Sequence, residues 1–131
     1  SSKRTRKKRI RNIKFIKIMK LRIWQSFKNA FQGIKIVLKS EKNFRIHLLI
    51  TLFVILFAFY RGLDKVMWIG LLLIIALVLA LEIFNSAIER LVDMLAPRTH
   101  SFAKEIKDLL AAMVLIVVIF AIVIGVIIFF A

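Results

Sequence analysis

The sequence lacks cysteine altogether and has only one proline and four glycines among its 131 residues. Without cysteine the chain has no disulfide framework, no thiolate metal site and no thiol redox motif. With so few glycines it also lacks the glycine-rich loop of the GxxxxGKS or GxxxxGKT type that cradles nucleotide phosphates. Any nucleotide site in this chain must therefore be built in another way.

Acidic residues are also scarce, and they are absent from the first 40 residues. Of the 22 Lys and Arg residues, 14 lie in residues 1–40, whereas five of the seven acids lie in residues 82–108. An excess of Lys and Arg marks the cytoplasmic side of a membrane protein. We therefore expect residues 1–40 and 82–108 to be cytoplasmic, and the turn at 61–65 and the C-terminus to be external.

Apolar residues make up 61% of the chain, and its mean hydropathy is +0.87. Three apolar runs approach the roughly 20 residues that a helix needs to cross a bilayer. The transmembrane helices expected from these runs cover about residues 44–61, 65–95 and 104–131. The predicted fold is an all-α integral membrane protein of the cell membrane.

The segment before the first apolar run has an amphipathic pattern from residue 14 to residue 40. At about 100° per residue, one stripe of that helix is apolar; it contains Ile16, Met19, Ile23, Phe27, Ala30, Phe31, Ile34 and Leu38. The pattern predicts a surface helix that contacts membrane lipids, with residues 1–13 as a basic tail that can also simply set the topology. Nucleic acid is not an expected partner, because base-stacking aromatic residues and a binding-domain signature are missing.

One helical face carries most of the remaining polar groups. Glu82, Asn85, Glu89 and Asp93 are spaced i, i+3, i+7 and i+11, so they share a face of one helix. Carboxylates so close together repel one another unless a cation or hydrogen-bond donors face them. Glu82 also follows a charge-free apolar run, which places it near the membrane boundary, where an ionisable residue indicates function.

Glu41 is the first acid of the chain, and the expected hairpin returns it to the same membrane face as Glu89. Mg²⁺ is usually held by one or two carboxylates together with substrate phosphates, so this pair is a candidate metal site. The alternative is that the carboxylates pair with neighbouring cations. For Glu82 the candidate partners are Lys104 and Arg90.

Basic and polar residues precede the third apolar run. A helix N-terminus with nearby cations suits a polyphosphate, although a topology-setting anchor would look the same. The candidate residues are Arg98, Thr99, His100, Lys104, Lys107 and Asp108.

Three stretches together resemble a known family. They are FQGIKIVLKSEKNFRIH (31–47), ALEIFNSAIERLVD (80–93) and KEIKDLLAAMVL (104–115). They are similar to the prokaryotic diacylglycerol kinase family, particularly its undecaprenol kinase branch from Gram-positive bacteria. The resemblance implies a homotrimeric membrane kinase that uses MgATP, with a surface helix and three transmembrane helices in each protomer.

The resemblance also implies roles for individual residues. Glu82 corresponds to the general base and Asn85 to its polar neighbour, while Glu41 and Glu89 correspond to the pair that binds Mg²⁺ and contacts the nucleotide. The other implied nucleotide-binding residues are Arg22, Asn29, Arg98, Thr99, His100, Lys107 and Asp108. Asn29 stands where the proteobacterial branch has an aromatic ring, and His47 stands where that branch has an acid.

The expected function is transfer of the γ-phosphate of ATP to the hydroxyl group of undecaprenol at the cytoplasmic membrane interface. Diacylglycerol is the alternative acceptor, because both lipids offer a primary hydroxyl group and the choice rests on the branch resemblance. Two other classes are a small membrane scaffold, in which carboxylates pair with lysines, and a cation channel or exchanger. The position of Glu82 at one boundary disfavours the channel.

Overall fold

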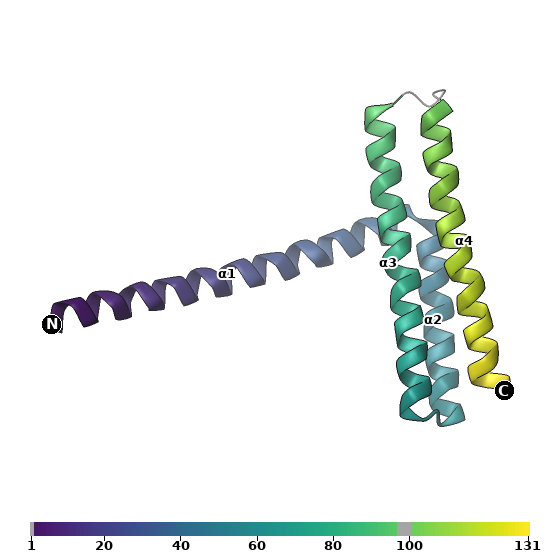
Figure 1. Ribbon diagram of the computed structural model, residues 1–131, viewed down its shortest axis with the longest axis horizontal. Helices are drawn as coiled ribbons and strands as arrows, with labels where there is room; N and C mark the ends of the chain where they lie inside the picture. The colour runs from purple at the N-terminus through teal and green to yellow at the C-terminus, as the bar shows by residue number, and fades with distance from the viewer. Residues whose placement is uncertain (1, 97–100) are drawn as a thin grey trace. The chain divides into compact units, whose positions relative to one another are not determined.

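The computed structural model describes residues 2–96 and 101–131, and these form four α-helices (Figure 1). The helices are α1 (Ser2–Ser40), α2 (Lys42–Arg61), α3 (Lys65–Leu95) and α4 (Ser101–Phe130). The chain divides into two compact units, Ser1–Ile36 and Val37–Ala131. The all-helical fold expected from the sequence is confirmed.

The first unit consists of most of helix α1. This 39-residue helix begins at Ser2. It therefore includes both the basic segment that we expected to be a tail and the surface helix that we expected to start at residue 14. Its large apolar side chains are exposed, and Trp24 reaches 71% exposure. A long helix with exposed apolar side chains gains little stability from its own unit.

The second unit begins with the last residues of α1 and turns sharply into α2. Arg45 on α2 donates hydrogen bonds through Nη1 to the carbonyl oxygens of Leu38 at 2.9 Å and Lys39 at 3.0 Å. These bonds satisfy carbonyl groups that the end of a helix leaves without intrahelical partners. Glu41, at the corner itself, adopts the extended N-cap conformation of α2.

A tight turn joins α2 to α3, as the sequence predicts for residues 61–65. Gly62 ends α2 in the left-handed region at φ 64°, and its N–H donates to the carbonyl of Phe59. Asp64 caps α3 by accepting a 2.8 Å hydrogen bond from the N–H of Met67. The short connection makes α2 and α3 antiparallel neighbours.

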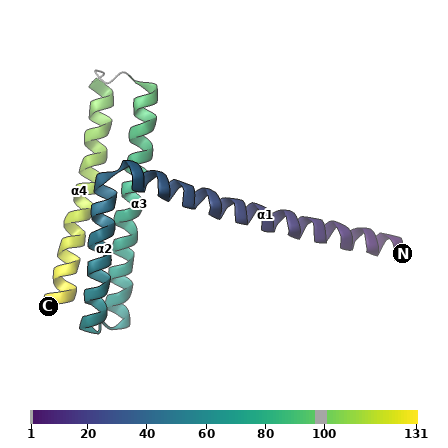
Figure 2. The ribbon, with the colours of Figure 1, turned by 180° about the vertical axis from the view of Figure 1, so that it is seen from behind.

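Helix α3 packs against both α2 and α4, and the three helices run alongside one another (Figure 2). The buried cluster of Ala58, Leu71 and Phe129 takes one residue from each helix, and Arg61 Nη2 donates to the carbonyl of Phe129 at 3.0 Å. Most other apolar side chains are exposed. All three helices are long and apolar enough to cross a membrane.

The three apolar helices differ in length, and this difference defines a polar end of the unit. At 1.5 Å per residue, the 20 residues of α2 span about 30 Å, whereas the 31 residues of α3 span about 46 Å. Helices α3 and α4 therefore continue past the start of α2 (Figure 1). The acidic stripe of α3 lies in and next to this extension, and it consists of Glu82, Asn85, Glu89 and Asp93.

Candidate functional site

Glu82 is the one charged side chain that is fully buried among the described residues, at 6% exposure. Its Oε1 lies 3.0 Å from Nδ1 of His47 on α2. The approach lies within hydrogen-bonding distance, but the ring is not aligned for a hydrogen bond. Burial of a carboxylate in an apolar helix is costly, so this residue marks a candidate functional site.

Asn85 lies one turn further along α3 and faces the same side as Glu82. Its Oδ1 atom is buried and has no hydrogen-bond partner within the described residues. An unsatisfied buried polar atom costs about 1–3 kcal/mol. Glu82 and Asn85 thus offer two adjacent polar groups within an otherwise apolar setting.

Glu41 lies against α3 through a network of short polar contacts. Ser86 donates from its hydroxyl group to Glu41 Oε1 at 2.9 Å. Arg90 Nη2 lies 3.6 Å from the same oxygen and donates to Ser40 Oγ at 2.6 Å. The hairpin therefore brings Glu41 to the acidic stripe of α3, as its sequence position predicts.

Glu89 is half-buried and lies one turn beyond Ser86 on α3, so it faces the side that contacts Glu41. It forms no ion pair with another described residue. Across residues 2–96 and 101–131, no group of three or more His, Asp or Glu side chains is arranged to hold a metal ion. Two carboxylates from different helices fit Mg²⁺ that phosphate oxygens also coordinate.

Two ion pairs occupy the polar end shared by α3 and α4. Lys107 Nζ lies 2.6 Å from Asp93 Oδ1 and joins the two helices. Lys104 Nζ lies 2.6 Å from Asp108 Oδ2, one turn away on α4. Pairing of Glu82 with Lys104 or Arg90, the alternative raised by the sequence, is therefore wrong, because both cations contact other groups.

The remaining predicted nucleotide ligands are not placed in this site. Arg98, Thr99 and His100 lie outside the described residues. Arg22 and Asn29 belong to the first unit, where the carbonyl of Arg22 accepts from the Ser26 hydroxyl group at 3.0 Å. Asn29 Oδ1 accepts from Gln25 Nε2 at 3.1 Å. Their contacts with a nucleotide stay predictions.

His47 is a site residue to which neither the residue spacing nor the family resemblance assigned a role. It lies 17 residues before Asp64, and Glu82 lies 18 residues after it. In an antiparallel hairpin with a tight turn, residues at equal distances from the turn lie opposite each other. The turn at 61–65 therefore carried a signal that pairs His47 with Glu82.

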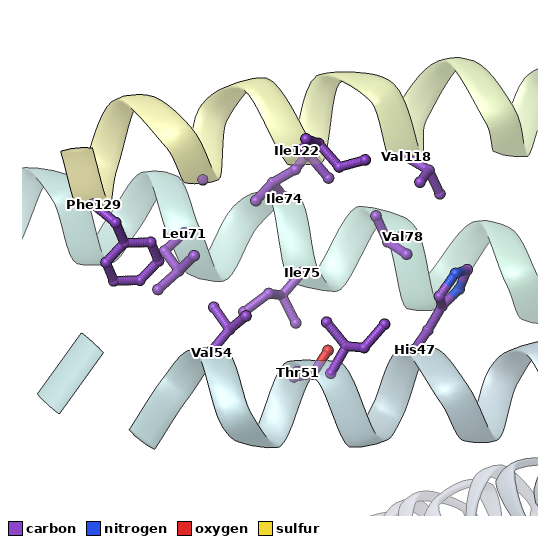
Figure 3. Close-up of a pocket in the computed structure, with 13 residues that line it drawn as sticks. His47, Thr51, Val54, Leu71, Ile74, Ile75, Val78, Val118, Ile122 and Phe129 are labelled. Carbon is purple, nitrogen blue, oxygen red and sulfur yellow. The ribbon is translucent and has the colours of Figure 1, made fainter. Parts of the chain in front are cut away.

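An apolar groove of about 310 Å³ begins beside His47. It lies among α2, α3 and α4 and extends to Phe129 at the other end of the bundle (Figure 3). Valine, leucine and isoleucine form most of its lining, and Thr51 and His47 are its polar members. A groove of this character accommodates a hydrocarbon chain next to the buried carboxylate.

Three helices that are long and apolar enough to cross a membrane, one of which carries a buried carboxylate, are typical of an integral membrane protein with an acidic site. A family model for prokaryotic diacylglycerol kinase matches residues 28–129, and the chain belongs to this family. The resemblance in sequence is thereby confirmed. The chain is accordingly a membrane lipid kinase, and a kinase of this family implies ATP as the phosphoryl donor.

Individual relatives agree with the family model. The chain is 32% identical to undecaprenol kinase of Bacillus subtilis over 108 residues, which are 82% of this chain and 88% of the relative. It is 36% identical to diacylglycerol kinase of Haemophilus influenzae, covering 63% of this chain and 70% of the relative. It is 35% identical to diacylglycerol kinase of Synechocystis, covering 76% of this chain and 58% of that longer relative.

Proposed function

We propose that the chain transfers the γ-phosphate of ATP to the primary hydroxyl group of undecaprenol at the cytoplasmic face of the cell membrane. The observation that carries this proposal is the buried carboxylate of Glu82 beside an apolar groove. The groove suits a long hydrocarbon chain with its hydroxyl group near Glu82. The undecaprenol kinase of Bacillus subtilis, similar over most of both chains, supports the choice of lipid.

In the proposed reaction, Glu82 acts as the general base. Its carboxylate accepts the proton of the lipid hydroxyl group while the hydroxyl oxygen forms a bond to the γ-phosphorus of ATP. The bond between that phosphorus and the bridging oxygen breaks, and ADP leaves. Asn85 orients the alcohol from one turn away. Burial keeps competing water away from the carboxylate.

Glu41 and Glu89 are the proposed ligands of Mg²⁺. Bound there with the phosphates, the ion would neutralise negative charge that develops during phosphoryl transfer. The hydrogen bond from Ser86 holds the Glu41 carboxylate against α3, and Glu89 is one turn away on the same face. Lys107 and Asp108 are proposed to contact the nucleotide together with Arg22, Asn29, Arg98, Thr99 and His100.

We also propose a homotrimer in which residues 14–131 form the kinase domain and neighbouring protomers complete the sites. The N-terminus is then cytoplasmic and the C-terminus external, because Lys and Arg concentrate in residues 1–40. Helix α1 lies on the membrane surface in this proposal. Its exposed apolar side chains and its many cations support that position.

Diacylglycerol is the second candidate acceptor, because several relatives are diacylglycerol kinases. The test offers undecaprenol and diacylglycerol in parallel to purified protein with radiolabelled MgATP in mixed micelles. Labelled undecaprenyl phosphate supports the proposal, whereas a preference for diacylglycerol overturns the choice of lipid. If a well-folded trimer labels neither lipid, the kinase proposal fails and a membrane scaffold becomes the better explanation.

A further inference from the structure

The contact between His47 and Glu82 joins a partly exposed imidazole on α2 to a buried carboxylate on α3. Their side chains are 22% and 7% exposed, and the nearest nitrogen and oxygen are 3.0 Å apart. The Glu82 carboxylate makes no other ion pair or side-chain hydrogen bond within the described residues. Among the described residues, His47 is the one side chain with a polar contact to this carboxylate.

The nearby cations are occupied elsewhere. Arg90 contacts Glu41 and Ser40, and Lys104 pairs with Asp108 on its own helix. An imidazole at this position can donate an N–H to the carboxylate.

We propose that His47 is a positioning residue for Glu82, holding the carboxylate in the orientation from which it accepts the proton of the lipid hydroxyl group. The proposal rests on the proposed role of Glu82 as the base. The Nδ1 atom lies 3.0 Å from Oε1, which is within hydrogen-bonding distance. His47 also lines the apolar groove, so it lies where the hydrocarbon chain meets the reacting group.

A spectroscopic test measures the contact without any turnover. The chain has only two histidines, so ¹⁵N-histidine labelling of the full-length protein in micelles gives two sets of imidazole signals, and His100→Gln assigns them. We expect Glu82→Gln to shift the ¹⁵N signals of His47, and we expect Glu105→Gln, at an exposed position of α4, to leave them unchanged. If Glu82→Gln leaves the His47 signals unchanged, the proposal is overturned.

A kinetic test then separates positioning from packing. His47→Leu removes the donor, whereas His47→Asn keeps an N–H near the position of Nδ1. We expect His47→Leu to lower kcat roughly 10- to 100-fold, the loss typical when a group that orients a functional side chain is removed. The KM for ATP stays unchanged, and His47→Asn restores most of kcat.

The outcomes distinguish this role from the proposed function itself. If Glu82→Gln is inactive while His47→Leu keeps wild-type kcat, the positioning role is overturned and the base assignment stands. Equal losses in His47→Leu and His47→Asn also overturn the positioning role, because packing alone would then explain them. If Glu82→Gln itself stays active, the assignment of Glu82 as the base is overturned, and the positioning role that rests on it is overturned as well.

Discussion

Replacing Glu82 by glutamine tests the chemistry most directly, because the change removes the basic oxygen and keeps the size of the side chain. Glu82 is buried at 6% exposure, so a smaller residue would leave a cavity, whereas glutamine fills the same space. The variant also removes the need to bury a charge, so we expect its thermal stability in micelles to be at least that of the wild type.

The expected loss follows from what a positioned general base contributes. Such a group typically accelerates a reaction by about 10²- to 10⁴-fold, which corresponds to roughly 2.7–5.5 kcal/mol of transition-state stabilisation. The assay is transfer of radiolabelled phosphate from MgATP to undecaprenol, measured as kcat with saturating ATP. We expect kcat of Glu82→Gln to decrease by a factor within this range or larger.

Glu105→Gln is the matched control, because it makes the same chemical change on an exposed carboxylate of α4. We expect this variant to keep wild-type kcat. The reasoning is refuted if Glu82→Gln retains kcat within about threefold of the wild type, since that loss is far below the contribution of a general base. Loss of the fold, detected as a lowered Tm, would refute the expectation that the variant packs normally.

The remaining predictions concern the proposed Mg²⁺ ligands, the turn at Gly62 and the ion pair between Asp93 and Lys107. Glu41→Gln and Glu89→Gln should each raise the Mg²⁺ concentration that gives half-maximal activity, and an unchanged Mg²⁺ titration would contradict their assignment as ligands. Gly62→Ala should cost about 1 kcal/mol of stability, read from denaturant titration, because Gly62 has φ +64° and no atom lies within 4 Å of an added Cβ. A double-mutant cycle of Asp93→Ala and Lys107→Ala should give a stability coupling below about 1 kcal/mol, since both side chains are partly exposed. In the same variants, Lys107→Ala should raise the KM for ATP more than Asp93→Ala does.

The acidic stripe shows what sequence spacing can predict about this site. Glu82, Asn85 and Glu89 share a face because an α-helix repeats every 3.6 residues, and α3 runs unbroken through all three. The family resemblance added their proposed roles, which spacing could not supply.

The partners of these residues were harder to predict. The sequence suggested Lys104 or Arg90 beside Glu82, because both are cations at the same membrane face. In the structure Lys104 finds Asp108 one turn away, and Arg90 reaches Ser40 and Glu41 across the bundle. Opposite charge is a poor guide to pairing when several cations and acids lie at one boundary.

The sequence by itself determined that this chain has three helices apolar enough to cross a membrane and an acidic stripe, because hydropathy and helical period are local properties of consecutive residues. The tertiary structure decided which side chains meet, because His47 contacts Glu82 and Ser86 donates to Glu41 only in the folded bundle. Those contacts depend on the register between α2 and α3. The turn around Gly62 and the packing of Ala58 on Leu71 set that register, and both bring together residues that are distant in the sequence.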